Sequence, residues 1–271
     1  MLKRPLFLLL TVCLLGCSSN GTSVPPPAPP PVAEKPKDVL IHLPGITGEL
    51  FIDREFVRGI KEAGYDGEIS IVDWTKGNLG IAALYAEKHN TQEAQKLAER
   101  IAQARKDNPR GRIVLSAHSG GNGIAVWALE RLPDDVKVDD VLFLAPALSP
   151  EYDLSKGLRH VKGHAYAFTS PYDVFILGAG TLLFRTMDGK RTDSAGRVGF
   201  VMPEGADAAQ YEKLVQEPYQ SAWIKYGNIG DHIGVMSKPF VATVIAPLVV
   251  RPEHLVRQPD PESVGEHAAT E

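Results

Sequence analysis

The chain has 271 residues, of which 44% are hydrophobic and 23% charged, and its formal net charge is −4. This length can bury one sizeable core, and a mildly acidic chain without a basic stripe argues against nucleic acid as a partner. The two cysteines are Cys13 and Cys17, so the chain beyond them can form no disulfide, thiolate metal site or cysteine nucleophile.

The beginning of the chain predicts export and lipid attachment. A short basic region, Met1–Arg4, precedes the apolar stretch Leu6–Leu15, which is too short to cross a bilayer as a mature helix. The stretch ends in Leu-Leu-Gly-Cys17-Ser, which resembles a bacterial lipobox. The resemblance implies that residues 1–16 are a signal peptide, that Cys17 receives a thioether-linked lipid, and that its new amino group receives an acyl chain such as palmitate. The alternative is a plain secretory signal with an incidental cysteine.

Serine directly after Cys17 resembles the lipoproteins that are sorted to the outer membrane. We therefore expect a lipid-anchored protein of the bacterial cell envelope, at the outer rather than the inner membrane. Residues 18–37 are rich in Ser and Gly and then in Pro, which favours an extended polyproline II spacer. With the lipidated cysteine they would form a tether, residues 17–37. We expect one globular domain at 38–250 and a loose, polar tail at 251–271.

Apolar runs alternate with helical patterns along the domain. The pattern predicts strands at 39–43, 68–72, 112–116, 141–144, 164–169 and 197–202, and helices near 53–63, 91–106, 121–132 and 238–246. Thr91 is expected to cap the second helix, whose apolar stripe contains Ala94 and Leu97. Strands that alternate with helices and are apolar on both faces favour an α/β fold, with a mostly parallel central sheet covered by helices on both faces. Sites in such sheets form beyond the carboxyl ends of the strands.

The segment Ala117-His118-Ser119-Gly120-Gly121 follows the third predicted strand and precedes an apolar helical stretch. This layout is typical of a nucleophile elbow, in which a serine on a sharp strand-to-helix turn projects its hydroxyl clear of the sheet. Small neighbours are needed because larger side chains at 117 and 121 would collide with the packed strand and helix. The alternative is an ordinary turn in which Ser119 caps the helix.

Two further strand ends carry polar residues. Thr169-Ser170-Pro171-Tyr172-Asp173 follows the fifth strand, and Gly230-Asp231-His232-Ile233-Gly234 places a histidine in a glycine-flanked turn before the last helix. Asp173 could instead cap a following helix. Asp231 and Asp140 are rival carboxylates, but Asp231 adjoins the histidine and Asp140 begins a strand. His118 is expected to pack or to donate a hydrogen bond.

Nucleophile, acid and base then follow in the order Ser119, Asp173, His232, which is the order of the α/β-hydrolase fold. Over residues 38–250 the chain resembles the α/β-hydrolase superfamily, in particular compact lipases and esterases with an Ala-x-Ser-x-Gly elbow. The resemblance implies a serine hydrolase in which Gly45 of the turn after the first strand precedes Ile46, and the backbone amides of Ile46 and Gly120 form the oxyanion hole. It implies no metal and no cofactor. The implied substrate is a small-molecule or lipid carboxylic ester, with thioester or amide also open.

Other features of the sequence bear less directly on the function. About ten residues lie between Ala145 and the next helix, which leaves no room there for a large cap domain. The apolar run Ile176–Phe184 is expected to be a buried core helix, with an acyl pocket or a flap as the alternative. The stretch 205–228 matches no pattern of the superfamily. His160 and His164 are four residues apart, but Gly163 argues against a metal-binding helix.

A second hypothesis belongs to a different class. The chain could be a non-catalytic envelope lipoprotein that uses a hydrolase fold as a binding module. Loss of one triad position or of the oxyanion glycines would indicate such a module. All these positions are filled here, which favours catalysis. Nothing in the sequence indicates an oligomeric state.

Overall fold

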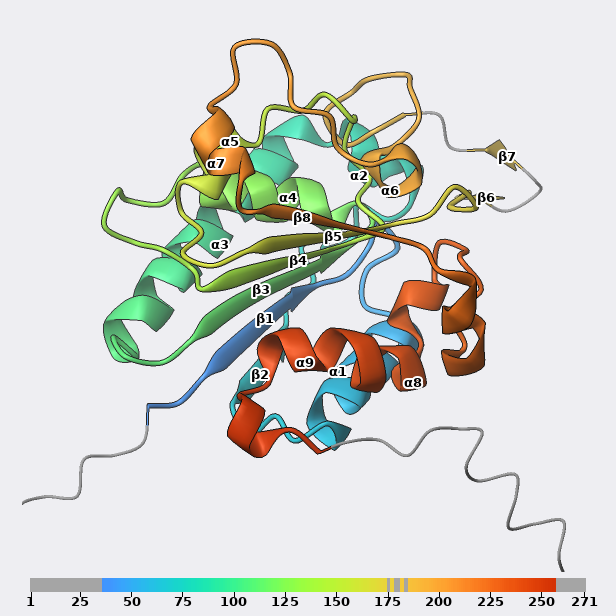
Figure 1. Ribbon diagram of the computed structural model, residues 1–271. Coiled ribbons are helices and arrows are strands. Elements are labelled where there is room, and N and C mark those ends of the chain that lie inside the picture. The colour runs from blue at the N-terminus through green and yellow to red at the C-terminus, as the bar shows by residue number, and fades with distance from the viewer. Residues whose placement is uncertain (1–35, 175, 178–180, 183–184, 257–271) are drawn as a thin grey trace, which may run out of the picture. The chain divides into compact units, whose positions relative to one another are not determined.

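The computed structural model describes residues 36–174, 176–177, 181–182 and 185–256 (Figure 1). The signal peptide, Cys17 and the tether up to residue 35 lie outside these residues, as does the tail beyond residue 256. The expectations for those parts of the chain therefore stay predictions.

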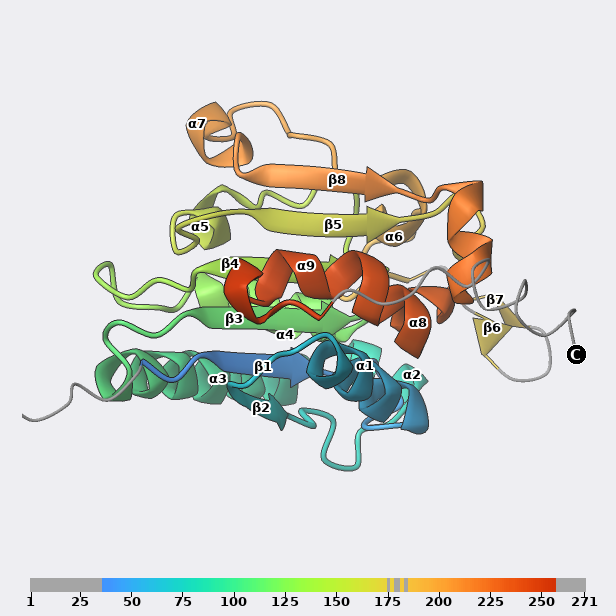
Figure 2. The ribbon, with the colours of Figure 1, turned by 60° about the horizontal axis from the view of Figure 1, so that its bottom comes forward.

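The centre of the domain is a six-stranded sheet in which every neighbouring pair of strands is parallel. Its strands, in the spatial order β2-β1-β3-β4-β5-β8, are Glu68–Ile71, Val39–Leu43, Ile113–His118, Asp140–Leu144, Ala165–Thr169 and Leu214–Pro218. Figure 2 shows their carboxyl ends at one edge. Since β1 and β3 are neighbouring interior strands, the turns that follow them lie side by side at that edge.

Alternate side chains of the central strands serve two separate cores. Val39, Ile41 and Leu43 of β1 belong to one hydrophobic cluster, whereas Leu40 belongs to the other. The two faces need cover by apolar helices, because both are buried. The sequence prediction of a parallel sheet with helices on both faces is confirmed.

Helices on the first face are α2 (Ile81–Tyr85), α3 (Glu87–Asp107), α4 (Gly121–Leu129), α5 (Ser155–Leu158), α6 (Ala195–Val198) and α7 (Ala208–Tyr211). The second face is covered by α1 (Phe51–Glu62) and by a C-terminal run of α8 (Lys238–Phe240), the π-helical turn η3 (Val241–Ile245) and α9 (Ala246–Val249). The 3₁₀ turns η1 (Ser221–Tyr226) and η2 (Gly234–Met236) precede that run. Helix α3 begins at Glu87, so Thr91 lies inside it and is not its cap.

The strand expected at 197–202 is not a strand. Residues 195–198 form α6, and Gly199 follows with a φ of +86°. The backbone N–H of Phe200 donates to the Gln216 Oε1 at 2.7 Å, and the Gln216 Nε2 donates to the Phe200 carbonyl at 3.0 Å. The glutamine side chain thus makes the backbone hydrogen bonds that a neighbouring strand would make. The sixth strand is β8, which lies in the stretch 205–228 that matched no pattern.

The core helix expected at 176–184 is also absent from the part of this run that the structure describes. Ile176–Leu177 (β6) and Thr181–Leu182 (β7) pair as two short antiparallel strands. Asp173 therefore does not cap a helix. The side chains of this run lie outside the described residues.

The tail expected from residue 251 is ordered in its first six residues. Pro252–His254 form the 3₁₀ turn η4, and the Val256 N–H donates to the Ala63 carbonyl at 2.9 Å. Arg251 donates to both oxygens of Asp38, at 2.8 and 2.7 Å. An ion pair therefore ties the first residues of this segment to the start of β1.

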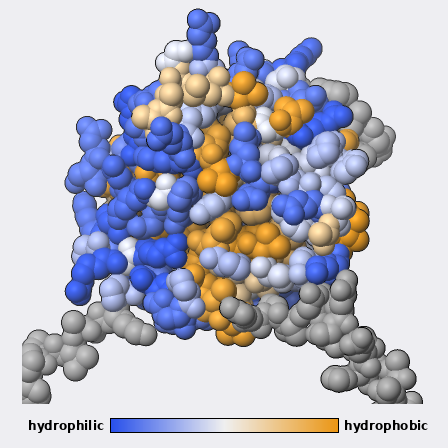
Figure 3. Space-filling view, in the orientation of Figure 1, coloured by the Kyte–Doolittle hydropathy of each residue, from blue (hydrophilic) through white to orange (hydrophobic). Residues whose placement is uncertain are grey.

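Among the described residues, no helix has both the length and the apolar character needed to cross a bilayer. Figure 3 shows one face of the domain, where hydrophilic residues cover most of the surface and apolar residues gather in the region in which Figure 1 draws α9. Val244 and Leu248 are half-buried apolar residues of this C-terminal run. The run thus covers the second core while some of its own apolar side chains reach the surface.

Replacing Arg251 by alanine should lower the free energy of unfolding by about 1–3 kcal/mol, because the buried Asp38 carboxylate loses two charged hydrogen bonds. Urea denaturation measures this. Lys37→Ala is the control, since Lys37 and its partner Glu68 are both more than half exposed and should contribute less than about 0.5 kcal/mol. Equal losses in the two variants would contradict the docking of residues 251–256.

Candidate active site

Ser119 lies on the turn between β3 and α4 with a φ of +53°, a conformation that non-glycine residues rarely adopt. Its N–H donates to the Leu144 carbonyl, and its carbonyl accepts from the Ala147 and Asn122 amides. A side chain on Gly121 would come within 2.5 Å of the Pro44 carbonyl oxygen. Glycine at position 121 is therefore required, because the turn after β1 approaches it closely.

Asn122, which sequence reasoning missed, holds this turn. Its side-chain amide is completely buried and donates to the carbonyls of Ser119 (2.9 Å) and Leu144 (3.1 Å). It therefore joins the turn to the end of β4. An asparagine in the first turn of a helix is common enough that no sequence signal marked it.

The structure brings Ser119, His232 and Asp173 together. The His232 Nε2 lies 2.8 Å from the Ser119 Oγ, and its Nδ1 lies 2.6 Å from the Asp173 Oδ1. All three residues are buried, with 4%, 7% and 5% of their surface exposed. A carboxylate only accepts hydrogen bonds, so Nδ1 carries the proton and Nε2 is left to accept from the serine hydroxyl. Such an array can activate the hydroxyl as a nucleophile.

Asp173 is supported by Gly196, a residue that the sequence did not single out. Gly196 of α6 lies so close that a Cβ there would collide with the Asp173 Oδ2. The Gly196 carbonyl accepts from the Ser170 N–H, and the Ser170 carbonyl from the Asp173 N–H. Helix α6 thus fixes the turn that carries the carboxylate.

The two rival carboxylates have other partners. The Asp231 Oδ1 accepts from the Gly234 N–H at 2.7 Å, within its own turn. Asp140 accepts from Arg112 and from the His164 amide, at the amino end of β4. Neither hydrogen-bonds to the His232 ring among the described contacts.

The turn after β1 lies against Ser119. A Cβ on Gly45 would lie 3.3 Å from the Ser119 Cβ and 3.7 Å from its Oγ. Within the described part of the chain, neither the Ile46 N–H nor the Gly120 N–H donates a hydrogen bond. Both residues are buried. Buried amides without acceptors are uncommon, so these two donors are free for a ligand oxygen beside Ser119.

A fully buried hydrogen-bond chain holds both ends of that turn. The His42 Nδ1 lies 3.1 Å from the Ser116 Oγ, its Nε2 lies 3.0 Å from the Asp53 Oδ1, and the Asp53 Oδ2 accepts from the Leu50 N–H at 2.7 Å. Burial opposes ionisation of Asp53, but the hydrogen bond to His42, the charge of His42 and the Leu50 amide together lower its pKa. Residues 44–50 are therefore closed by an interaction at their base.

His118 makes a hydrogen bond to the backbone; the sequence had predicted a packing or hydrogen-bonding residue, without naming a partner. Its Nε2 lies 2.9 Å from the His232 carbonyl oxygen, and the two rings lie 5.0 Å apart. Burial, followed by the charge of His232, lowers the pKa of His118 well below the usual value. The ring is therefore neutral at pH 7.

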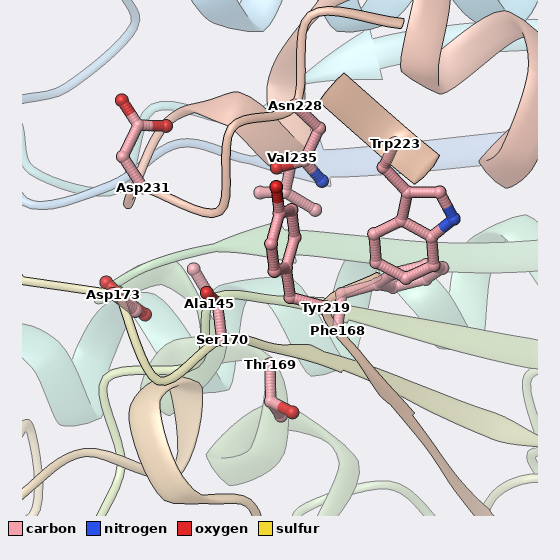
Figure 4. A pocket seen from close by; sticks show the side chains of 10 residues that line it. All are labelled: Ala145, Phe168, Thr169, Ser170, Asp173, Tyr219, Trp223, Asn228, Asp231 and Val235. Atoms are coloured by element: carbon pink, nitrogen blue, oxygen red, sulfur yellow. The ribbon is translucent and has the colours of Figure 1, made fainter. Parts of the chain in front are cut away.

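Two hollows adjoin the site. A cavity beside Asp173, lined also by Ser170, Tyr219 and Trp223, offers about 20 Å³ to water centres (Figure 4). That space holds one water molecule but no ester. A groove that offers about 370 Å³ on the same measure lies between the start of α1 and the His232 turn, and its apolar walls include Phe51, Ile229 and Ile233. This groove has the size of a small-molecule site.

In the described ranges, no group of three or more histidine, cysteine or acidic side chains could hold a metal ion. His160 is buried, and its Nδ1 lies 2.9 Å from the Val136 carbonyl oxygen. His164 is exposed at the start of β5. The structure gives these two histidines no shared ligand position.

No protein-family model and no curated protein sequence matches the chain. Among solved structures, it is similar to lipase B of Aspergillus fumigatus, with a TM-score of 0.51 and 13% identity over 84% of this chain and 56% of the lipase. A predicted CIB-like hydrolase from Thermoplasma acidophilum has a TM-score of 0.45 and 13% identity over 80% and 88% of the two chains. A cutinase-like protein from Cryptococcus sp. has a TM-score of 0.38 and 16% identity over 76% and 90%.

The domain has the α/β-hydrolase fold, and the described residues contain no large cap, as the sequence predicted. The lipase match carries this assignment, because the other two scores lie below 0.5. The chain spans just over half of the length of that lipase. At such low identity the likeness extends to the fold alone.

Protonation of His118 should make the domain less stable in acid. The pKa of His118 is lowered by folding, so below about pH 6.5 the unfolded chain binds a proton that the folded chain does not, and stability falls with pH. Between pH 7 and pH 5 this contributes a loss of about 2 kcal/mol. Urea denaturation at both pH values should show that loss reduced in His118→Gln. His164→Gln, at an exposed histidine, is the control, and an equal pH dependence in wild type and His118→Gln would contradict the assignment.

Proposed function

We propose that this chain is a serine hydrolase that cleaves carboxylic esters by acyl transfer through Ser119, His232 and Asp173. One observation carries the proposal: a serine at positive φ is hydrogen-bonded to a histidine that is itself hydrogen-bonded to a buried carboxylate. The three residues come from turns at the carboxyl ends of β3, β5 and β8, where the fold places its sites.

The first step forms an acyl-enzyme. The Ser119 Oγ attacks the ester carbonyl carbon while the His232 Nε2 takes the hydroxyl proton, and Asp173 stabilises the charged imidazole through Nδ1. The Ile46 and Gly120 amides donate to the oxyanion, which is supported by the lack of another acceptor for either amide among the residues that the structure describes. The carbon–oxygen bond to the alcohol then breaks, and the alcohol leaves with the proton from Nε2.

The second step releases the acid. Water attacks the acyl carbon and gives a proton to the His232 Nε2, and the tetrahedral intermediate is again held by the two amides. The bond from the acyl carbon to Oγ breaks, and Ser119 regains the proton. The carboxylic acid leaves, and the site returns to its initial state.

Apolar side chains around the site support esters with an apolar arm. The segments after β1, β2, β5 and β8, including the first residues of α1 and α2, each expose large apolar residues, namely Leu50, Phe51, Leu79, Ile81, Tyr172, Ile229 and Ile233. A soluble domain rarely exposes such residues together unless they contact an apolar partner. The groove beside His232 continues this apolar rim. Thioesters and amides undergo the same chemistry and belong in the substrate panel.

We also propose that Cys17 anchors the enzyme at the bacterial envelope, in the outer membrane. Removal of residues 1–16 and lipidation of Cys17 would leave the tether between the membrane and β1. Mass spectrometry of the full-length protein should show the lipid, and Cys17→Ser should abolish it. An unmodified, secreted wild-type protein would favour the plain signal peptide.

A fluorophosphonate probe should label the wild-type domain, residues 36–271, at Ser119. Ser119→Ala and His232→Ala should both lose labelling and lose ester turnover by at least about a thousandfold, because either change removes a member of one cooperating unit. Circular dichroism checks that both variants fold. Absence of labelling in a folded wild-type domain would sink the catalytic proposal and favour the non-catalytic binding module.

Gly196→Ala should lower turnover by displacing the Asp173 carboxylate, because the new Cβ collides with its Oδ2 and comes within 2.8 Å of the Ala145 carbonyl carbon. A loss of roughly ten- to hundredfold in kcat is expected for a shift of this kind. Gly157→Ala is the matched control, since a Cβ there meets its nearest neighbour at 3.6 Å. Full activity of Gly196→Ala would contradict the role of Asp173.

A further inference from the structure

His118, the residue directly before the nucleophile, connects β3 to the turn that carries the catalytic base. It is the last residue of β3 and only 4% exposed, and its Nε2 lies 2.9 Å from the backbone carbonyl oxygen of His232. The contact joins residues 114 positions apart. Neither the hydroxyl chemistry nor the oxyanion hole uses this side chain.

The contact fixes the tautomer of His118. A carbonyl oxygen can only accept a hydrogen bond, so Nε2 must carry the proton. Because burial keeps the ring neutral, Nδ1 is then unprotonated. Nδ1 lies toward the turn after β1, where a Cβ on Gly45 would be 3.5 Å away. One neutral ring therefore lies between the turn of the base and the turn of the oxyanion hole.

Hydrogen bonds within the turn of His232 set its shape. Within the turn, the Asn228 Oδ1 accepts from the Gly230 N–H and the Asp231 Oδ1 accepts from the Gly234 N–H. Gly230 adopts a φ of +87°. These bonds shape the turn but connect it only to itself. The bond from His118 connects it to the central strand that also carries Ser119.

We propose that His118 is a positioning residue. Its Nε2–H donates to the His232 carbonyl and so holds the backbone of His232 where the imidazole can hydrogen-bond to both Ser119 and Asp173. The inference rests on the proposed serine-hydrolase function and adds a residue to it. Strand β3 thereby positions both the nucleophile and the base. It carries Ser119 directly after its last residue, and it holds His232 through the side chain of His118. A misplacement of the base by about 1 Å would cost up to roughly a hundredfold in rate.

The test compares two nearly isosteric variants. His118→Gln keeps an N–H donor at about the reach of Nε2, whereas His118→Met fills the space without a donor. His118→Met should lower kcat and the rate of fluorophosphonate labelling by roughly ten- to hundredfold with KM changed less than about threefold, and His118→Gln should recover most of the loss. The pH profile of kcat/KM should shift in His118→Met and not in His118→Gln.

A matched pair elsewhere controls for the loss of a buried histidine. His160 is also buried and also bonds a backbone carbonyl, that of Val136 at 2.9 Å, but it lies in the loop before β5 at the opposite edge of the sheet. His160→Met and His160→Gln should lower the melting temperature with kcat unchanged. If His118→Met does not fold, His118→Asn, whose amide is too short to reach the His232 carbonyl, takes its place.

Two results would overturn the inference: kcat unchanged in a folded His118→Met, or a loss that His118→Gln does not recover. Failure of the proposed function looks different, since the wild type itself would then neither label nor turn over esters. In that event the proton between the His232 Nδ1 and Asp173 is observed by NMR. A change of its resonance in His118→Met but not in His118→Gln upholds the positioning role, and no change in either refutes it.

Discussion

The site depends on one strained residue. Ser119 adopts a φ of +53°, which costs a non-glycine residue about 1–3 kcal/mol. The strain persists because surrounding contacts over-determine the turn: its N–H is bonded to the end of β4, and Asn122 bonds its carbonyl from the first turn of α4. Gly121 allows the β1 turn to approach at the same point. Without this geometry the hydroxyl could not stand between His232 and the two free amides.

Parallel strands supply the remaining constraint. Asp173 and His232 are 59 residues apart, and Ser119 and His232 are 113 apart, yet all three follow strands whose carboxyl ends share one edge. The parallel sheet thus brings residues that are far apart in the sequence close together in space. The turns and loops after the strands are sufficient to complete the site. Helix α6 has only four residues, yet it can hold the turn that carries Asp173. Gly196 acts through direct contact with the Asp173 carboxylate, so the length of the helix matters little.

Much of this could be predicted from the sequence, because β1, β3, β4 and β5 are mostly apolar, and the turns after β1, β3 and β5 contain Gly45, Ser119 and Asp173. The sixth strand could not. β8 is a half-exposed edge strand ending in Pro218, and its alternation over five residues is weak. The apolar residues 198–202 looked more like a strand, but Gly199 and the bonds to Gln216 place them beside the sheet as a coil. An apolar run indicates burial, but here only Phe200 is a buried apolar side chain, whereas Val198, Val201 and Met202 are exposed.

Three buried histidines show where sequence reasoning must end. His42 lies within β1, His118 ends β3 and His232 follows β8 and η1, and residue type and spacing do not rank them. Their partners do. His42 lies between a serine hydroxyl and a carboxylate, but it is completely buried, so no substrate can reach Ser116. His232 repeats the same serine–histidine–carboxylate order where the serine adjoins two free amides. His118 contacts neither a hydroxyl nor a carboxylate, and its bond to a carbonyl leaves it able to position but not to transfer a proton to Ser119. A histidine side chain thus has three different roles. His42 links two buried side chains, His232 is positioned to act as the base, and His118 holds the backbone of His232, because the fold gives each histidine different hydrogen-bond partners.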